Sequence, residues 1–338
     1  MALLLLYTDR LNHQYQIDLL RSGDLRALAR AISIVENHSP GWIELLKELF
    51  PHTGKALTLG LTGSPGAGKS TLVDQLAKHY RDSKNLHSKK GALSGAPRTE
   101  VSEDDRYTVG IIAVDPTSPY TGGAILGDRI RMQSHFSDPG IYIRSMATRG
   151  SLGGLARATA DVSLVLDAAG RDVIMIETVG VGQDEVDIVR VADITVVILV
   201  PGMGDDVQSI KAGIMEIADI FVINKSDHDG AERVEKEIRA LQSLAQRKDG
   251  WTPPIVKTVA TEGKGTDALE GAIRDYENFL RQNELLKSRR AEHWQLRLIE
   301  MLRDSLLEKA RAAVSQDELA RLAADIAEHK RDPYSVIE

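Results

Sequence analysis

A glycine-rich octapeptide between an apolar run and a segment of helical periodicity constrains the fold more than any other feature of this sequence. The run covers Leu57 to Thr62, and Gly63-Ser64-Pro65-Gly66-Ala67-Gly68-Lys69-Ser70 leads from it into Thr71-Leu72-Val73. This is GxxxxGK[ST] in a strand-loop-helix setting, where backbone N–H groups and a helix N-terminus surround phosphate oxygens. We predict nucleotide binding by 63–71, with Lys69 at the β- and γ-phosphates and Ser70 on Mg²⁺. A glycine turn that only caps a helix is the alternative.

The tetrapeptide Asn224-Lys225-Ser226-Asp227 indicates which base is bound. It follows the apolar run Asp219 to Ile223, and ligands of parallel sheets bind at the carboxyl ends of the strands. The Asp227 carboxylate can accept hydrogen bonds from guanine N1–H and from the 2-amino group, a donor pair that adenine lacks. The sequence therefore predicts guanine, although an ordinary turn capped by Asp227 would have the same four residues.

Two further strand ends carry candidate nucleotide contacts. Val259-Ala260-Thr261 ends an apolar run, where either a backbone N–H contacts guanine O6 or the strand simply stops. Glu177 precedes Gly180 by three positions, so its carboxylate can hold Mg²⁺ through a water while the Gly180 N–H senses the γ-phosphate. Val181 stands where the Ras pattern has a water-orienting glutamine, which predicts slow intrinsic hydrolysis.

Asp115 and Asp128 bracket a glycine-rich stretch between two of the predicted elements. The stretch is Asp115-Pro116-Thr117-Ser118-Pro119-Tyr120-Thr121-Gly122-Gly123-Ala124-Ile125-Leu126-Gly127-Asp128. It could close over Mg²⁺ and the γ-phosphate. Alternatively, Asp115 forms a turn before Pro116 and Asp128 caps a helix.

Apolar runs without alternation recur along the chain, as expected for strands covered on both faces. They are Leu57 to Thr62, Val109 to Val114, Val173 to Ile176, Ile194 to Val200, Ile220 to Ile223 and Ile255 to Val259. Helical patterns lie between them, at Leu72 to Tyr80, Leu155 to Ala168, Val207 to Ala218 and Glu232 to Leu244. This alternation predicts an α/β fold with a mostly parallel sheet flanked by helices.

The periodicity also suggests three regions. We predict a helical extension over 1–50, a nucleotide-binding domain over 51–282 with a mobile insertion at 82–106, and a helical extension over 283–338. In the last region Trp294, Leu298 and Leu306 recur at helical spacing. Those apolar stripes predict a homodimer, because a sheet already flanked by helices leaves them uncovered.

Composition excludes several classes of protein. The net charge of -7 gives no general attraction to nucleic acid or to anionic membranes, and the absence of cysteine excludes disulfides and thiolate metal sites. No apolar run is long enough to span a bilayer, and the opening residues lack the basic leader of a signal peptide. A cytoplasmic protein is expected.

Taken together, these motifs resemble the MeaB/ArgK family of G-protein chaperones. The resemblance rests on the P-loop from Gly63, VDPTSPYTGGAILGDRIRM from Val114, ATRGSLGGLARAT from Ala147, ETVGVGQ from Glu177 and NKSD from Asn224. It covers nearly the whole chain, and the two long segments are more specific than a P-loop alone. The insertion at 82–106 departs from the family pattern.

The resemblance implies a SIMIBI-class P-loop GTPase that forms homodimers and assists an adenosylcobalamin-dependent acyl-CoA mutase, with GTP state gating cofactor loading. Carried onto this sequence, it implies Mg²⁺ ligation by Ser70, Asp115, Asp128 and Glu177. It also implies a switch loop from Pro201 in which Lys211 supports partner-stimulated hydrolysis, beside Lys69 and Glu177 as the other catalytic residues.

Two other functions compete with this interpretation. A P-loop kinase that phosphorylates a small molecule or a transport protein would need an acceptor pocket and usually a base, and nothing in the sequence singles these out. A metal-insertion GTPase would need a cysteine or histidine cluster, but the nine histidines are scattered.

Overall fold

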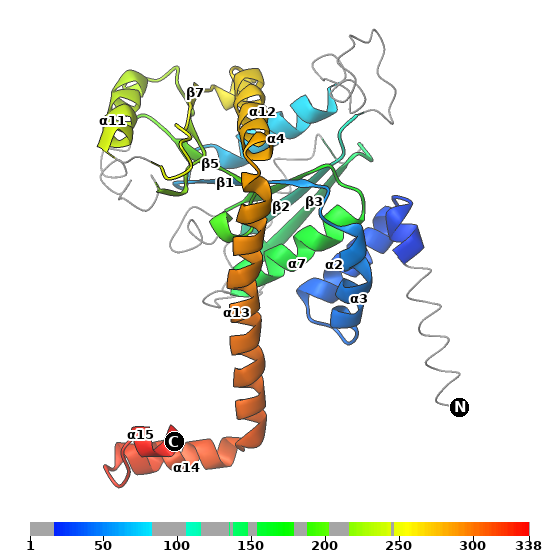
Figure 1. Ribbon diagram of the computed structural model, residues 1–338, viewed down its shortest axis with the longest axis vertical. Helices are drawn as coiled ribbons and strands as arrows, with labels where there is room; N and C mark the ends of the chain where they lie inside the picture. Colours follow the sequence, from blue (N-terminus) through cyan, green and yellow to red (C-terminus); the bar gives the residue numbers. More distant parts are fainter. Residues whose placement is uncertain are drawn as a thin grey trace. The chain divides into compact units, whose positions relative to one another are not determined.

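The computed structural model describes residues 17–82, 106–115, 135, 138–147, 154–178, 188–202, 216–244 and 247–337. The chain divides into two compact units, 1–286 and 287–338. The first unit is built on a parallel seven-stranded sheet with the order β3-β2-β4-β1-β5-β6-β7 (Figure 1). Its strands are β1 (Leu57–Gly63), β2 (Val109–Asp115), β3 (Ile141–Ala147), β4 (Val173–Glu177), β5 (Ile194–Leu199), β6 (Ile220–Ile223) and β7 (Ile255–Lys257). The predicted α/β fold is confirmed.

Helices cover both faces of the sheet. On one face, α4 (Lys69–Arg81) and α12 (Thr266–Gln282) share an apolar cluster with Val196 and Ile198 of β5. On the other, α2 (Leu25–Glu36), α3 (Trp42–Leu49) and α7 (Gly154–Ala168) pack over β2 and β4, while α11 (Ala231–Leu244) covers Val197 and Leu199 of β5. Because successive side chains point to opposite faces, these central strands are buried on both sides, which explains why their sequences do not alternate.

The sequence pattern does not predict strand β3. This edge strand pairs only with β2, and most of its side chains are half-buried. Arg144 in its middle bonds the Glu36 carboxylate of α2, with an Nε to Oε2 distance of 2.9 Å. A half-covered edge strand needs no continuous apolar run, so the pattern that found the central strands passes over this one.

The N-terminal helices pack within the first unit. Ile17, Leu28 and Leu49 are buried in the same cluster as Ile174 of β4. The Asp24 side chain begins α2 by accepting a hydrogen bond from the Ala27 N–H at 2.7 Å. The boundaries that we predict at 50/51 and 282/283 stay predictions, and residues 83–105 of the predicted insertion lie outside the described residues.

At the amino edge of the sheet, three aspartates make the same pair of hydrogen bonds to a neighbouring strand. Asp193 precedes β5, accepts a hydrogen bond from the Thr58 N–H at 3.0 Å and donates its own N–H to the Thr58 carbonyl at 2.8 Å. Asp219 exchanges the same pair of bonds with Thr195, at 2.8 and 2.9 Å. Asp172, which precedes β4, does so with Thr108, at 2.7 and 2.9 Å. Each carboxylate thus fastens the start of its strand to a neighbouring strand.

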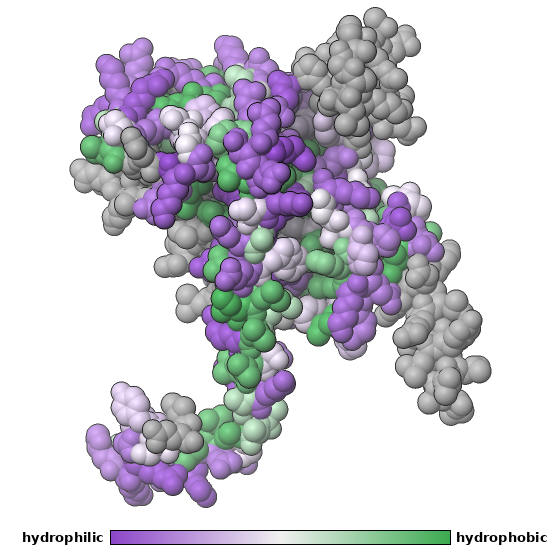
Figure 2. All heavy atoms as spheres, in the orientation of Figure 1, coloured by the Kyte–Doolittle hydropathy of each residue, from purple (hydrophilic) through white to green (hydrophobic). Residues whose placement is uncertain are grey.

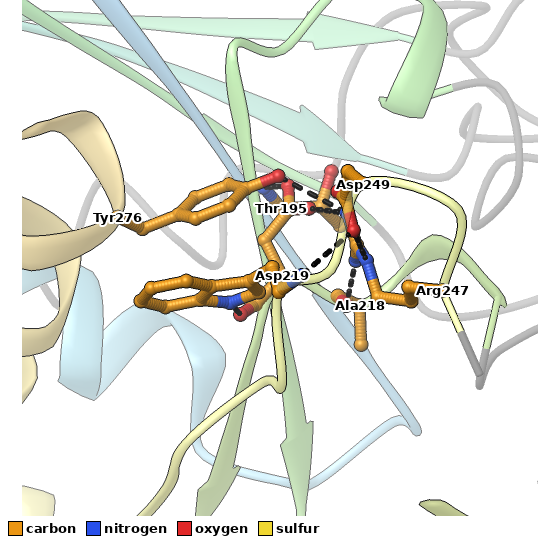
Figure 3. Close-up of polar contacts among 7 residues, drawn as sticks. Thr195, Ala218, Asp219, Arg247, Asp249 and Tyr276 are labelled. Carbon is orange, nitrogen blue, oxygen red and sulfur yellow. Dashed lines mark hydrogen bonds and ion pairs between the residues drawn. The ribbon is translucent and has the colours of Figure 1, made fainter. Parts of the chain in front are cut away.

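Arg247 completes this edge beside Asp219 (Figure 3). Its guanidinium lies 3.0 Å from the Asp219 carboxylate and 2.6 Å from the Asp249 carboxylate. It also donates hydrogen bonds to the Ala218 carbonyl at 2.7 Å and to the Tyr276 hydroxyl at 3.1 Å. Burial alone would lower the pKa of Arg247, but the bond to Asp249 and the charge of Asp219 outweigh it and raise the pKa above its ordinary value. The amino edge is therefore fastened by the buried Asp219 carboxylate and its half-buried neighbours Arg247 and Asp249.

The second unit is helical, as the periodicity predicts. It contains most of α13 (Leu285–Ala313), together with α14 (Gln316–Ala327) and α15 (Tyr334–Ile337). Ser315 begins α14 by accepting a hydrogen bond from the Glu318 N–H at 3.2 Å. Apolar atoms gather along α13 at the surface (Figure 2), and none of its residues is buried. In the described part of the chain, no helix has the length and apolarity that a bilayer crossing requires.

Candidate functional site

The octapeptide forms a cradle at the carboxyl edge of the sheet, between β1 and α4. Gly63 has a φ of 146°, and a Cβ at this position would lie 2.1 Å from the Ile198 carbonyl oxygen. Gly68 has a φ of 85°, and its Cβ would lie 2.4 Å from the Asn224 side chain. Only glycine fits at these two positions, so backbone, without side chains, lines the cradle at both ends. A phosphate chain suits this shape because its oxygens can be met by main-chain N–H groups.

Lys69 and Ser70 begin α4 at the mouth of the cradle. The buried Lys69 ammonium donates to the carbonyls of Gly63 and Ser64, at 2.7 and 3.0 Å. The ammonium therefore folds back over the loop, where the terminal phosphates of a nucleotide would lie. Together with the positive end of α4, it concentrates positive charge at this point in a protein of net negative charge.

Ser70 meets Glu177, which is 107 residues away in the sequence, at the end of β4. The Ser70 Oγ donates to Glu177 Oε1 at 2.6 Å, and both residues are buried. A hydroxyl beside a carboxylate supplies the oxygen ligands that Mg²⁺ prefers. The backbone of Asp115 reaches the same edge on the neighbouring strand, since Ala113 of β2 is in register with Glu177. Among the described residues, no group of three or more histidines or carboxylates is placed to hold a metal ion.

Several predicted residues cannot be compared with the geometry. Asp128, Gly180 and Lys211 lie outside the described residues, as does the side chain of Asp115. Their roles stay predictions.

Asn224 joins two loops of the candidate site. Its Nδ2 donates to the Ala67 carbonyl at 2.8 Å, and its Oδ1 accepts from the Thr258 hydroxyl at 3.0 Å and from the Ala260 N–H at 3.1 Å. The Asn224 amide thus ties the cradle to the segment that follows β7. These bonds hold the glycine-rich loop and the segment 258–260 together through one side chain.

The remaining base candidates differ in what they offer a ligand. Half of the Asp227 side chain is exposed, at 51%, and a carboxylate oxygen lies 3.9 Å from Nε2 of His228. The Val259 N–H donates to the Lys264 carbonyl at 3.0 Å, and the Ala260 N–H donates to Oδ1 of Asn224. The N–H of the exposed Thr261 makes no hydrogen bond to a described residue. Of the three predicted N–H donors, Thr261 is the one available to a base.

Sequence reasoning missed a set of threonines that support the site. The Thr178 hydroxyl donates to that of Thr62 at 3.0 Å, and the Thr178 N–H donates to the Leu61 carbonyl at 3.1 Å. Thr258 supports Asn224 as described above. All three threonines are buried polar residues at or just beyond the carboxyl end of an apolar strand. Attention to polar residues at that position would have found them.

Comparison with known proteins gives a consistent result. The family model described as methylmalonyl-CoA mutase-associated GTPase MeaB matches residues 28–86 and 99–315. A relative from Pyrococcus abyssi is 48% identical over 322 residues, which are 94% of this chain and 93% of that protein. The GTPase ArgK of Escherichia coli is 37% identical over 77% of this chain and 75% of its own length. The methylmalonic aciduria type A homolog of Mus musculus is 34% identical over 83% of this chain and 68% of its own length.

A solved structure has a similar fold over nearly the whole chain. It is described as a LAO/AO transport system kinase, with 27% identity and a TM-score of 0.67, over 96% of this chain and 94% of that one.

Proposed function

The chain belongs to the family of methylmalonyl-CoA mutase-associated GTPases, and from this premise we propose that it uses GTP hydrolysis to gate adenosylcobalamin loading of a mutase and to protect that enzyme. The GTPase activity belongs to the family. The proposal concerns the residues that perform it, the ion that assists it and the partner that it serves. The observation that carries it is the Asn224 amide, which links the phosphate cradle to the predicted base loop in one site.

In this proposal the triphosphate lies in the cradle of 63–71. The backbone N–H groups and the N-terminus of α4 face its oxygens, and Lys69 exchanges its two carbonyl partners for the β- and γ-phosphates. That exchange is favourable because a charged acceptor makes a stronger hydrogen bond to an ammonium than a carbonyl does. Gly180 is assigned to the γ-phosphate by its place in the sequence.

The proposed Mg²⁺ ligands are Ser70, Glu177, Asp115 and Asp128. Support comes from the Ser70 hydroxyl and the Glu177 carboxylate, which already lie 2.6 Å apart. Bound Mg²⁺ would neutralise charge that develops on the β- and γ-phosphate oxygens. Glu177 holds this position because β4 pairs directly with β1, which leads into the cradle.

Guanine would be read by Asp227 and by the N–H of Thr261. The half-exposed Asp227 carboxylate can accept from two guanine donors, and the Thr261 N–H can donate to O6. Lys225, at a left-handed φ of 54°, stands between Asn224 and this carboxylate and turns the chain there.

A partner-controlled rate is the testable core of the proposal. With Val181 in place of a water-orienting glutamine, basal turnover is slow, and a bound mutase would bring the Lys211 ammonium to the transferring phosphoryl group. We expect methylmalonyl-CoA mutase to raise GTP turnover of the wild type roughly a hundredfold, as is typical for a positioned charged donor. Lys211→Ala should keep GTP affinity and basal turnover but lose the stimulation. Equal stimulation of both proteins removes Lys211 from the mechanism, and an unstimulated wild type contradicts partner gating.

The kinase alternative has one observation in its favour, since the solved structure of similar fold is that of a LAO/AO transport system kinase. The two functions differ in where the γ-phosphate goes. With γ-labelled GTP, a GTPase releases the label as inorganic phosphate in the presence of cell extract, whereas a kinase transfers it to an acceptor. Label recovered mainly on a small molecule or a second protein would favour the kinase.

We also propose a homodimer formed through α13. The support is a row of large apolar side chains that are 45% to 65% exposed in the described chain, namely Leu296, Leu298, Ile299, Met301, Leu302, Leu306 and Leu307. Such a surface on a 29-residue helix is typical of an interface between subunits. Removal of 287–338 should give a monomer in light scattering that still binds GTP. If the truncated protein is still a dimer, the interface lies elsewhere in the chain.

We propose that this dimer acts in the cytoplasm, with no membrane or nucleic-acid partner.

A further inference from the structure

Helix α4 holds His135 and residues 138–140 through two side chains on one of its faces. The Asp74 carboxylate lies 2.8 Å from His135 Nε2, which also lies 3.2 Å from the Asp74 carbonyl. The Arg81 guanidinium binds both oxygens of Asp138, at 2.9 and 2.8 Å. Asp74 and Arg81 are two helical turns apart and therefore share a face.

His135 and residues 138–140 are also joined to one another by hydrogen bonds. The Asp138 N–H donates to the His135 carbonyl at 3.0 Å, and the Gly140 N–H donates to the Asp138 side chain at 2.8 Å. Arg81 lies against Gly140, because a Cβ added there would be 2.1 Å from the guanidinium carbon. The Ile141 N–H then bonds the Asp138 carbonyl at 3.1 Å as β3 begins. His135 and residues 138–140 are therefore positioned by α4.

The two attachments lie at different depths along α4. Arg81 is at the end of the helix near the amino edge of the sheet, where it also bonds the Tyr107 carbonyl at 3.0 Å. Asp74 lies on the same side of α4 as Ser70, one turn further along, at a separation of roughly 6 Å along the helix axis. The His135 attachment is thus the one that lies near the proposed magnesium ligands.

We propose that His135 is a positioning residue for the GTPase reaction, acting through Asp74 of the helix that carries Ser70. The proposal rests on the proposed magnesium site. In the sequence His135 comes seven positions after Asp128, and Asp115 begins the same stretch at the end of β2. The described residues on either side of Asp128 in the sequence are Asp115, at the end of β2, and His135, which contacts α4.

The chemistry of the contact requires a donor on His135. Both neighbouring Asp74 atoms are acceptors, a carboxylate oxygen and a carbonyl oxygen, so Nε2 carries the hydrogen. The His135 side chain is 7% exposed, and solvent therefore cannot easily replace the lost bond. A glutamine has a donor that can reach the position of Nε2, whereas a leucine fills a similar volume without one.

The test compares four proteins, namely wild type, His135→Leu, His135→Gln and the control Lys78→Ala. Lys78 is exposed on the same helix, four positions after Asp74. For each, GTP affinity is titrated with Mg²⁺ and with a chelator, and turnover is measured at saturating GTP. In His135→Leu, we expect the gain in GTP affinity on adding Mg²⁺ to be roughly tenfold smaller than in the wild type, and kcat to be roughly tenfold lower. GTP affinity in the presence of the chelator should be unchanged. His135→Gln should recover both, and Lys78→Ala should match the wild type.

Other outcomes count against the proposal in different ways. An unchanged magnesium-dependent gain and kcat in folded His135→Leu overturns the role of His135 and leaves the magnesium site standing. A wild type without any magnesium-dependent gain overturns the magnesium site and this inference with it. If His135→Leu does not fold, Asp74→Leu and Asp74→Asn repeat the comparison from the helix side. Both variants keep the backbone carbonyl of residue 74, but only Asp74→Asn keeps a side-chain acceptor, so equal kinetics in these two variants contradict the proposal.

Discussion

At the amino edge of the sheet, the buried Asp219 carboxylate binds the Thr195 N–H and the Arg247 guanidinium, all within the protein. At the carboxyl edge, the buried Lys69 ammonium rests on two carbonyls of the very loop that would hold phosphate. Both edges bury charge, but the first uses it to join strands and the second keeps it where a ligand can take over its partners. Under the proposed function, the difference separates residues that hold the fold from residues that bind nucleotide.

The largest effect is expected at the amino edge. Asp219→Ala leaves the half-buried Arg247 without its buried partner and the buried Thr195 N–H without its side-chain acceptor, which should lower the free energy of unfolding by about 3–5 kcal/mol. Under conditions where the variant is folded, its GTP affinity should equal that of the wild type. Denaturant unfolding and a GTP titration at the same temperature measure the two quantities.

A milder variant keeps this comparison informative if Asp219→Ala does not fold. Tyr276→Phe removes only the hydroxyl that binds Arg247 at 3.1 Å, for an expected loss of about 1 kcal/mol. A drop in GTP affinity with either folded variant would break the division between the two edges.

At the carboxyl edge the expected effects are reversed. Lys69→Ala removes a charged donor to two phosphates and should weaken GTP binding roughly a hundredfold. The free energy of unfolding should change by less than about 1 kcal/mol, because the variant also loses the cost of burying the Lys69 charge, which offsets the loss of its two bonds to carbonyls. The same titration and unfolding experiments apply, with Lys78→Ala as the matched control. Equal GTP affinity with and without Lys69 would contradict the cradle as the phosphate site.

The smallest expected effect is an acid-dependent one at the amino edge. Burial alone would raise the pKa of Asp138, but hydrogen bonds from Arg81 and from the Gly140 N–H lower it below its ordinary value of 3.8. The folded pKa is the lower one, so this carboxylate stabilises the protein above pH 3.8, and its contribution is lost as pH falls through the folded pKa. The difference in Tm between wild type and Asp138→Asn should therefore narrow below about pH 4. A constant difference down to pH 2.5 would contradict the shift.

The central strands and the glycine-rich turn between β1 and α4 were predictable because their constraints are local. A run such as Val173 to Ile176 reports burial on both faces, and glycine is required at Gly63 by the close approach of the Ile198 carbonyl. Edge strand β3 was not predictable in this way, since half-exposed positions accept residues such as Arg144. Its existence depends on pairing with β2, which periodicity does not encode.

Side-chain partners were the other gap. Asn224 is predictable as part of a guanine motif, but its bonds to Ala67 and Ala260 depend on segments that only the folded sheet brings together. The aspartates before three strands look like ordinary turn residues in the sequence. Their exchange of hydrogen bonds with threonines follows from strand order, which a single sequence leaves open.

The contacts of Arg81 also bear on how this chain can vary in length. Arg81 bonds the carbonyl of Tyr107, so the two chain ends that flank residues 83–105 are joined by a direct contact. The family match passes over residues 87–98 within that interval. Because the ends are already held together, extra residues there add little loop-closure cost, which grows only slowly with length. This junction is a natural site for genetic insertion, and it should accept a peptide tag or a shortened connection without disturbing either edge of the sheet.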